Sequence, residues 1–250
     1  MNNIKRGSVL RTAGLALALG LAVAGTANAA EPIRRKSSMQ TEQTLSASKQ
    51  AIGPIAAFAA TGDIDKLKIA LAHGLDTGLS VAECKEILVQ LCAYAGFPRS
   101  LNALTALMQV LEARKRDGVI DAPGIAPAPA LTGDALLASG TANQTQLVGA
   151  PVAGPLFDFA PAIDQFLKTH LFGDIFNRNN LDWQSRELAT VAVLAAMTGV
   201  EAQLQSHVGI SLNVGLTGPQ LRQFIGVLAE RVDAATAQRA QSALDKQLAR

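Results

Sequence analysis

Residues 181–225 read LDWQSRELATVAVLAAMTGVEAQLQSHVGISLNVGLTGPQLRQFI, and residues 45–88 read LSASKQAIGPIAAFAATGDIDKLKIALAHGLDTGLSVAECKEIL. Aligned with one extra residue near Met197, both stretches show the same order of elements. A helix start leads into an Ala-rich helix, a glycine, a second helix and a Gly-Leu-Ser or Gly-Leu-Thr turn. Such a repeated order is typical of a duplicated structural unit. The sequence therefore predicts an all-α fold made of two tandem helical repeats.

Local signals in each copy support this interpretation. Apolar residues recur at helical spacing, and Gly62 or Gly199 ends the first helix of its copy. The third helix of each copy opens with a Ser or Thr followed three residues later by Glu or Gln, which is the capping-box spacing. The polar residues expected to cap the first and third helices are Ser46, Ser80, Asp182 and Thr217.

These signals define the expected domains. The first repeat covers residues 40–116, where GFP at 96–98 separates its third helix from one more. Residues 117–156 are rich in Pro, Gly and Thr without sustained periodicity, and predict a linker or an arm that wraps a partner. The remainder, 157–250, begins with a Phe-rich segment that predicts an amphipathic helix covering the core or a subunit contact, followed by the second repeat.

The start of the chain predicts a signal peptide of residues 1–29. Basic residues precede an apolar run, and Ala27 and Ala29 form an Ala-Xaa-Ala cleavage pattern. The run is too short for a permanent transmembrane helix, so we expect no permanent membrane span. We expect export by the Sec or twin-arginine route, cleavage near Ala29, and a periplasmic or secreted protein.

The composition limits the classes of partner and the kinds of cysteine chemistry that we expect. The net charge is +2, without a block of Lys and Arg, so nothing favours a nucleic acid partner. The only cysteines, Cys84 and Cys92, are eight residues apart, which is about 12 Å along one helix and beyond disulfide reach. We expect both to be buried small side chains, with an intermolecular or sensor role as the alternative.

Two stretches resemble a known family. RELATVAVLAAMTGVEAQLQSHVGISLNVGLT (186–217) and EILVQLCAYAGFPRSLNALTALMQVL (86–111) are similar to the two halves of the carboxymuconolactone decarboxylase family, which includes the alkylhydroperoxidase D-like proteins. The resemblance implies an all-helical fold that assembles into trimers or hexamers. It also implies chemistry on a small-molecule substrate with neither a metal nor an organic cofactor.

The resemblance also selects candidate catalytic residues. The hydroperoxidase branch uses a Cys-Xaa-Xaa-Cys pair whose second cysteine lies four residues before the histidine. Those positions are Val200 and Gln203 here, so this chain lacks the nucleophile of that branch. Glu187 and His207 match the glutamate and histidine of the family's proton relay. An imidazole exchanges protons near neutral pH, as an acid/base catalyst must. Glu201 is a third catalytic candidate, although its six-residue spacing from His207 places it on another face of the helix.

The first copy has alanine at both positions that align with Glu187 and His207, yet it keeps YAGFPRSLNAL at 94–104. We therefore hypothesise one composite site per chain. His207 and Glu187 come from the second copy, and the substrate-binding candidates Tyr94, Arg99 and Asn102 come from the first.

These observations leave three alternative hypotheses for the function. The first is a cofactor-free acid/base lyase acting on a small carboxylated lactone or, given the export signal, a related acid. The second is an alkylhydroperoxidase-type antioxidant, which would need Cys84 or Cys92 as its thiol. The third is a non-catalytic exported oligomeric binding protein that retains the fold.

Overall fold

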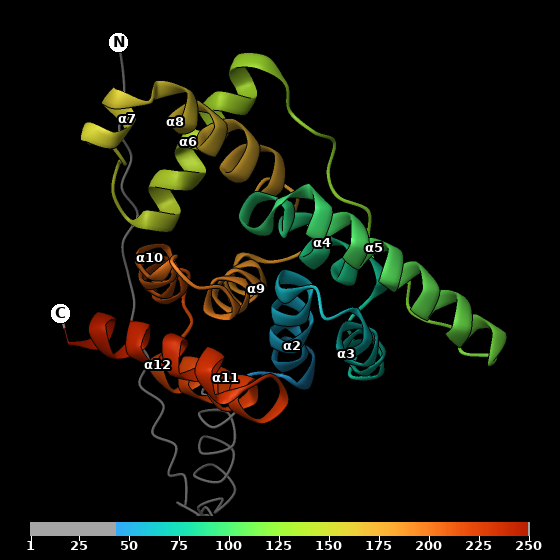
Figure 1. Ribbon diagram of the computed structural model, residues 1–250. Helices are drawn as coiled ribbons and strands as arrows, with labels where there is room; N and C mark the ends of the chain where they lie inside the picture. Colours follow the sequence, from blue (N-terminus) through green and yellow to red (C-terminus); the bar gives the residue numbers. More distant parts are fainter. Residues whose placement is uncertain (1–43, 250) are drawn as a thin grey trace, which may run out of the picture. The chain divides into compact units, whose positions relative to one another are not determined.

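A computed structural model describes residues 44–249, and within this range the chain forms helices and no strand (Figure 1). The predicted signal peptide lies outside the described residues. No helix in the described range combines the length and the apolar character needed to cross a membrane. In chain order the helices are α2 (Ala47–Thr61), α3 (Ile64–Asp76), α4 (Val81–Gln90), α5 (Cys92–Arg116), α6 (Gly133–Val148), α7 (Pro155–Phe159), α8 (Pro161–Phe166), the π-helix η1 (Leu167–Ile175), α9 (Trp183–Ala196), α10 (Glu201–Asn213), α11 (Gly218–Arg231) and α12 (Ala234–Leu248).

The predicted helix starts are confirmed at the level of hydrogen bonds. Asp182 accepts a hydrogen bond from the Ser185 amide at 2.8 Å, and Ser46 caps α2 in the same way. Both predicted capping boxes form, because each N-cap hydroxyl accepts from the third amide of its helix and the third side chain reaches back to the N-cap amide. These caps satisfy amides that would otherwise lack partners and so fix where α2, α4, α9 and α11 begin.

Helices α2 and α9 form the centre of the core. They pack along each other, α3 lies against α2, and α10 and α12 lie against α9 (Figure 1). Every residue from Ser185 to Ala195 is buried, because the alanines on α2 and α9 allow close approach on several sides. A charged residue on α9 in this stretch therefore needs a partner inside the protein.

The junction between α4 and α5 bends the chain twice. α4 ends at Gln90, and the first turn of α5 is separated from the rest by Gly96, whose φ of 81° and ψ of 161° are non-helical. This left-handed φ favours glycine, and Pro98 follows it. The predicted interruption at residues 96–98 is thus confirmed, and it leaves Tyr94 in a short turn that packs against both hydrophobic clusters of the core.

Residues 117–156, which the sequence predicts as a linker or an arm, contain the helix α6 at 133–148. This helix packs on η1 through glycine rather than through an apolar stripe. A Cβ on Gly140 would lie 1.7 Å from the carbonyl oxygen of Lys168, so only glycine permits this approach. Periodicity could not reveal a helix whose buried residues are Gly140, Gln144 and Leu147.

The Phe-rich segment is not the single amphipathic helix that the sequence predicts. It is divided into α7, α8 and η1, because Pro161 has no amide to continue α7 and instead begins α8. Only its last part is buried. Four of its residues join Leu147 and Ile210 in a second hydrophobic cluster, and these are Leu171, Phe172, Ile175 and Phe176.

Candidate functional site

Glu187 and His207 form a buried hydrogen-bonded pair. Nδ1 of His207 on α10 lies 2.8 Å from Oε2 of Glu187 on α9. The Glu187 side chain has no exposed surface, whereas about 10% of the His207 side chain remains exposed. Glu187 lies one turn inside α9, so its carboxylate is held by the buried helix and not by the first-turn amides. The carboxylate and the imidazole are therefore each other's fixed partners.

Tyr94 completes this cluster from the first half of the chain. Its ring packs edge-on against the His207 ring, with 5.5 Å between ring centroids and an angle of 81°. Burial raises the pKa of the Tyr94 hydroxyl, and the charge of nearby Glu187 raises that pKa further, so the hydroxyl stays protonated. The cluster thus joins residues from both predicted repeats.

Two polar atoms of the cluster are buried without a hydrogen-bond partner, namely the Tyr94 hydroxyl and Oε1 of Glu187. The neighbouring Thr190 hydroxyl already donates to the Arg186 carbonyl and accepts from Gln90. Buried polar groups in native proteins are nearly always satisfied, so these two atoms retain the capacity to hydrogen-bond a water molecule or a substrate atom.

The geometry suits proton transfer at one ring nitrogen. Nδ1 of His207 faces a carboxylate oxygen, which accepts hydrogen bonds, so the tautomer that fits this contact has its N–H at Nδ1 and donates the hydrogen bond to Glu187. The other nitrogen, Nε2, can then accept or donate a proton at a bound molecule, while the negative charge of Glu187 stabilises the imidazolium. The Tyr94 ring packs against this imidazole, and its hydroxyl is a further hydrogen-bond donor in the cluster.

A second buried charge network lies next to the pair and begins at the neighbouring residue of α9, Arg186. Arg186 has no exposed surface and donates to Glu86 at 3.0 Å and to Gln90 at 3.2 Å. Arg178 forms two further hydrogen bonds to Glu86 at 2.7 and 2.8 Å. Burial alone would raise the pKa of Glu86, but the two guanidinium groups hold it below its ordinary value. The carboxylate is therefore charged, and it anchors α4 to the start of α9.

This network was missed by sequence reasoning. A usable signal was present, because Arg186 and Glu187 are adjacent charges in a helix that is otherwise Ala- and Leu-rich. Two charges at the start of a buried helix imply two buried partners.

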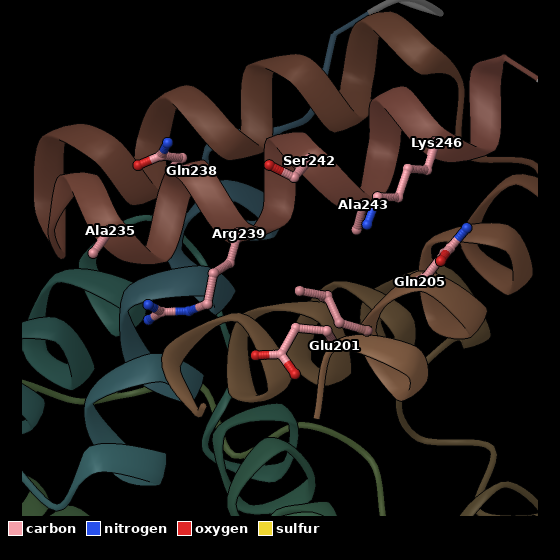
Figure 2. A pocket seen from close by; sticks show the side chains of 9 residues that line it. Glu201, Gln205, Ala235, Gln238, Arg239, Ser242, Ala243 and Lys246 are labelled. Atoms are coloured by element: carbon pink, nitrogen blue, oxygen red, sulfur yellow. The ribbon is translucent and has the colours of Figure 1, made fainter. Parts of the chain in front are cut away.

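The structure does not bring Glu201 to His207. Glu201 is exposed at the first turn of α10 and accepts a hydrogen bond from the Gly199 amide at 3.1 Å. Backbone amide hydrogen bonds lower the pKa of its carboxyl group. Figure 2 shows Glu201 facing Arg239 and other α12 side chains across an open cleft of about 340 Å³. Its local role is to accept hydrogen bonds from backbone amides at the start of α10.

Two of the three substrate-binding candidates also lie apart from the pair. Arg99 is exposed, and its guanidinium covers Gly62, where a Cβ would lie 1.5 Å from Nη1. That position is the C-terminal end of α2, which attracts a cation. Asn102 is exposed on α5. Of the three, the structure places Tyr94 beside the pair.

The two cysteines are both free. Cys84 is fully buried, which raises the pKa of its thiol to about 12 and removes it as a nucleophile at neutral pH. Cys92 is half-buried, and burial raises its pKa too. Within residues 44–249, no group of three or more His, Cys, Asp or Glu side chains is arranged to hold a metal ion.

Comparison with known proteins gives two matches. The model of the carboxymuconolactone decarboxylase family matches residues 161–246, a range that contains Glu187 and His207. The 4-carboxymuconolactone decarboxylase of Acinetobacter baylyi (strain ATCC 33305 / BD413 / ADP1) is 33% identical over 70 residues, which are 28% of this chain and 52% of that protein. The chain thus spans about half the length of this curated relative. Residues 161–246 are therefore a carboxymuconolactone decarboxylase family domain.

Proposed function

We propose that this protein is a cofactor-free acid/base lyase that decarboxylates a small carboxylated lactone or a related acid. The observation that carries the proposal is the 2.8 Å hydrogen bond between the buried Glu187 carboxylate and Nδ1 of His207. A buried carboxylate–imidazole pair with one free ring nitrogen is the arrangement that proton delivery requires. The name of the Acinetobacter relative, 4-carboxymuconolactone decarboxylase, indicates the substrate class to test first.

The reaction needs one proton and no electron acceptor. When the bond between the substrate carbon and its carboxylate breaks, CO2 leaves and the electron pair stays on carbon, delocalised into the lactone carbonyl. Nε2 of the protonated His207 then donates its proton to that carbon, and Glu187 stabilises the imidazolium before transfer. The Tyr94 hydroxyl donates a hydrogen bond to the developing enolate oxygen, which is the role that its unpartnered position suits.

The test is a substrate screen with the wild type and His207→Ala side by side. We expect CO2 release from 4-carboxymuconolactone or a related carboxylated lactone by the wild type. We expect a loss of about 10²–10⁴-fold in His207→Ala, because the proton donor is gone. β-Keto acids and hydroperoxides complete the panel. Thiol-dependent hydroperoxide turnover that survives His207→Ala would favour the antioxidant alternative, and no turnover of any substrate would favour the binding protein.

We also propose that residues 40–116 are a diverged copy of the matched domain. The support is that α2, α3 and α4 follow one another as α9, α10 and α11 do, with a side-chain N-cap on α2 and α9 and a capping box on α4 and α11. Tyr94 from this copy lies on His207 of the other, which explains why the first copy can lack its own acid/base pair.

Finally, we propose that the protein is a homo-oligomer, a trimer or a hexamer, that assembles through α7 and α8. Apolar side chains on these helices are unusually exposed, at 64% for Leu156, 88% for Phe159 and 45% for Ile163. We expect Phe159→Glu to reduce the mass measured by light scattering to that of one chain, because burying a carboxylate in an apolar contact is unfavourable. Ile120→Glu, at an exposed loop residue, is the control. A wild-type protein that is monomeric at micromolar concentration contradicts the proposal.

A further inference from the structure

A half-buried thiol lies next to a partly exposed imidazole and carboxylate, and none of the three belongs to the proposed acid/base pair. Sγ of Cys92, the first residue of α5, lies 3.7 Å from Nε2 of His170 on η1. Nδ1 of the same ring lies 3.5 Å from Oδ2 of Asp174, one turn later. The His170 and Asp174 side chains are 44% and 46% exposed, so small molecules can reach them.

The order of these groups suits proton transfer from the thiol to the ring. With its proton on Nδ1, which lies 3.5 Å from the Asp174 carboxylate, the ring presents the lone pair of Nε2 to the thiol. The Cys92 S–H then donates to Nε2, and the imidazole can take this proton when the sulfur reacts. A nucleophile beside a base that a third group orients is the arrangement of activated serine and cysteine sites, and these contacts are often long before a substrate binds.

Burial raises the pKa of the Cys92 thiol, so the resting group is a thiol and not a thiolate. Such a thiol reacts only if a base accepts its proton as the new bond forms. His170 is in place to do this. Cys84 has no comparable base and no exposed surface, so it serves as an internal reference.

We propose that Cys92 is a site of covalent modification by small conjugated alkenes, with His170 as its proton acceptor and Asp174 as the residue that orients His170. The exposed Phe97 ring, 6.5 Å from the His170 ring, supplies an apolar flank for such a molecule. An oxidative cycle is less suitable, because the chain has one other cysteine and it is buried in the other hydrophobic cluster.

The addition is balanced without an oxidant, a reductant or a leaving group. The thiol proton moves to Nε2 of His170, and the sulfur electron pair forms a bond to the β-carbon of the alkene. The π pair of the carbon–carbon double bond moves to the α-carbon and the carbonyl. The imidazolium then returns its proton to the α-carbon, giving a saturated thioether.

N-Ethylmaleimide is the probe, because it is a small conjugated alkene. The full-length native protein is labelled for increasing times, digested, and analysed by mass spectrometry for the peptides that contain Cys84 and Cys92. We expect rapid labelling of Cys92 and none of Cys84 in the native state. His170→Gln and Asp174→Asn should each slow Cys92 labelling, the first at least about tenfold, because the proton acceptor is lost.

His73→Gln, at a histidine on α3, is the matched control and should leave the rate unchanged. Labelling of Cys84 in any variant reports loss of the native fold. A Cys92 rate that is unchanged or faster in His170→Gln overturns the proposal, since exposure alone would then explain the reactivity. The result is independent of decarboxylation, because neither Glu187 nor His207 takes part.

Discussion

Replacing Glu187 with glutamine is expected to lower turnover of the decarboxylation substrate by about 10²–10⁴-fold. Glutamine keeps the shape of the side chain and can still hydrogen-bond Nδ1 of His207. It has no negative charge, however, so it cannot stabilise the imidazolium that donates the proton. The measurement is the steady-state rate of CO2 release, with kcat and KM determined separately. A fall in kcat at nearly constant KM identifies a loss in the chemical step.

Glu201→Gln is the matched control for this prediction. Both glutamates are sequence-based candidates, but Glu201 is exposed and faces α12. We expect its rate to stay within about twofold of the wild type, since exposed carboxylates remote from the reacting atoms contribute little. Equal losses in the two variants would contradict the assignment of Glu187 as the partner of His207.

Replacing Glu86 with alanine is expected to lower the free energy of unfolding by about 3–5 kcal/mol, the usual cost of removing one partner from a buried ion pair. The Arg186 guanidinium has no exposed surface and would lose its counter-charge. Urea denaturation followed by circular dichroism measures the change. Glu83→Ala is the comparison, because Glu83 is a partly exposed carboxylate on the same helix. Its loss removes a helix cap only, which is worth about 1 kcal/mol. Similar losses in both variants would show that the network contributes no more than a cap.

The same network sets a pH dependence of stability. The folded-state pKa of Glu86 is lower than the ordinary value of a glutamate, so the folded protein binds the proton more weakly than the unfolded chain does. This stabilisation is complete above the ordinary glutamate pKa of about 4.3 and is lost as pH falls through the lower folded-state pKa. The stability difference between wild type and Glu86→Ala should therefore shrink in acid.

Much of the fold could be predicted from local chemistry. Caps such as Ser80 and Thr217 act within one turn, so the sequence alone indicates where their helices begin. The break at Gly96 was readable for the same reason. The pairing of Glu187 with His207 was suggested by the family resemblance, and the structure places the two side chains at hydrogen-bonding distance.

The parts that sequence could not predict depend on contacts between distant segments. α6 packs through the close approach of Gly140 to Lys168. Its sequence therefore lacks the helical spacing of apolar residues from which a helix is predicted. Arg99 belongs to the YAGFPRSLNAL stretch at 94–104, yet its guanidinium covers the left-handed turn at Gly62, which gives it a structural role. The side-chain partners of Arg186, Glu86 and Gln90, lie about 100 residues earlier in the chain, where no local pattern indicates them.

The adjacent buried charges on α9 also have a consequence for how the chain selects one packing arrangement. Arg186 is paired with α4, and Glu187 is paired with α10. Successive residues on an α-helix point about 100° apart, so a slip of α9 by a single residue would turn each charge away from its partner. The alanine-rich surface of α9 could tolerate such a slip, since one small side chain resembles the next. Both of these pairs can form at only one rotation of α9 about its own axis. The two charges therefore select that rotation, and with it the position of the His207 imidazole relative to Glu187.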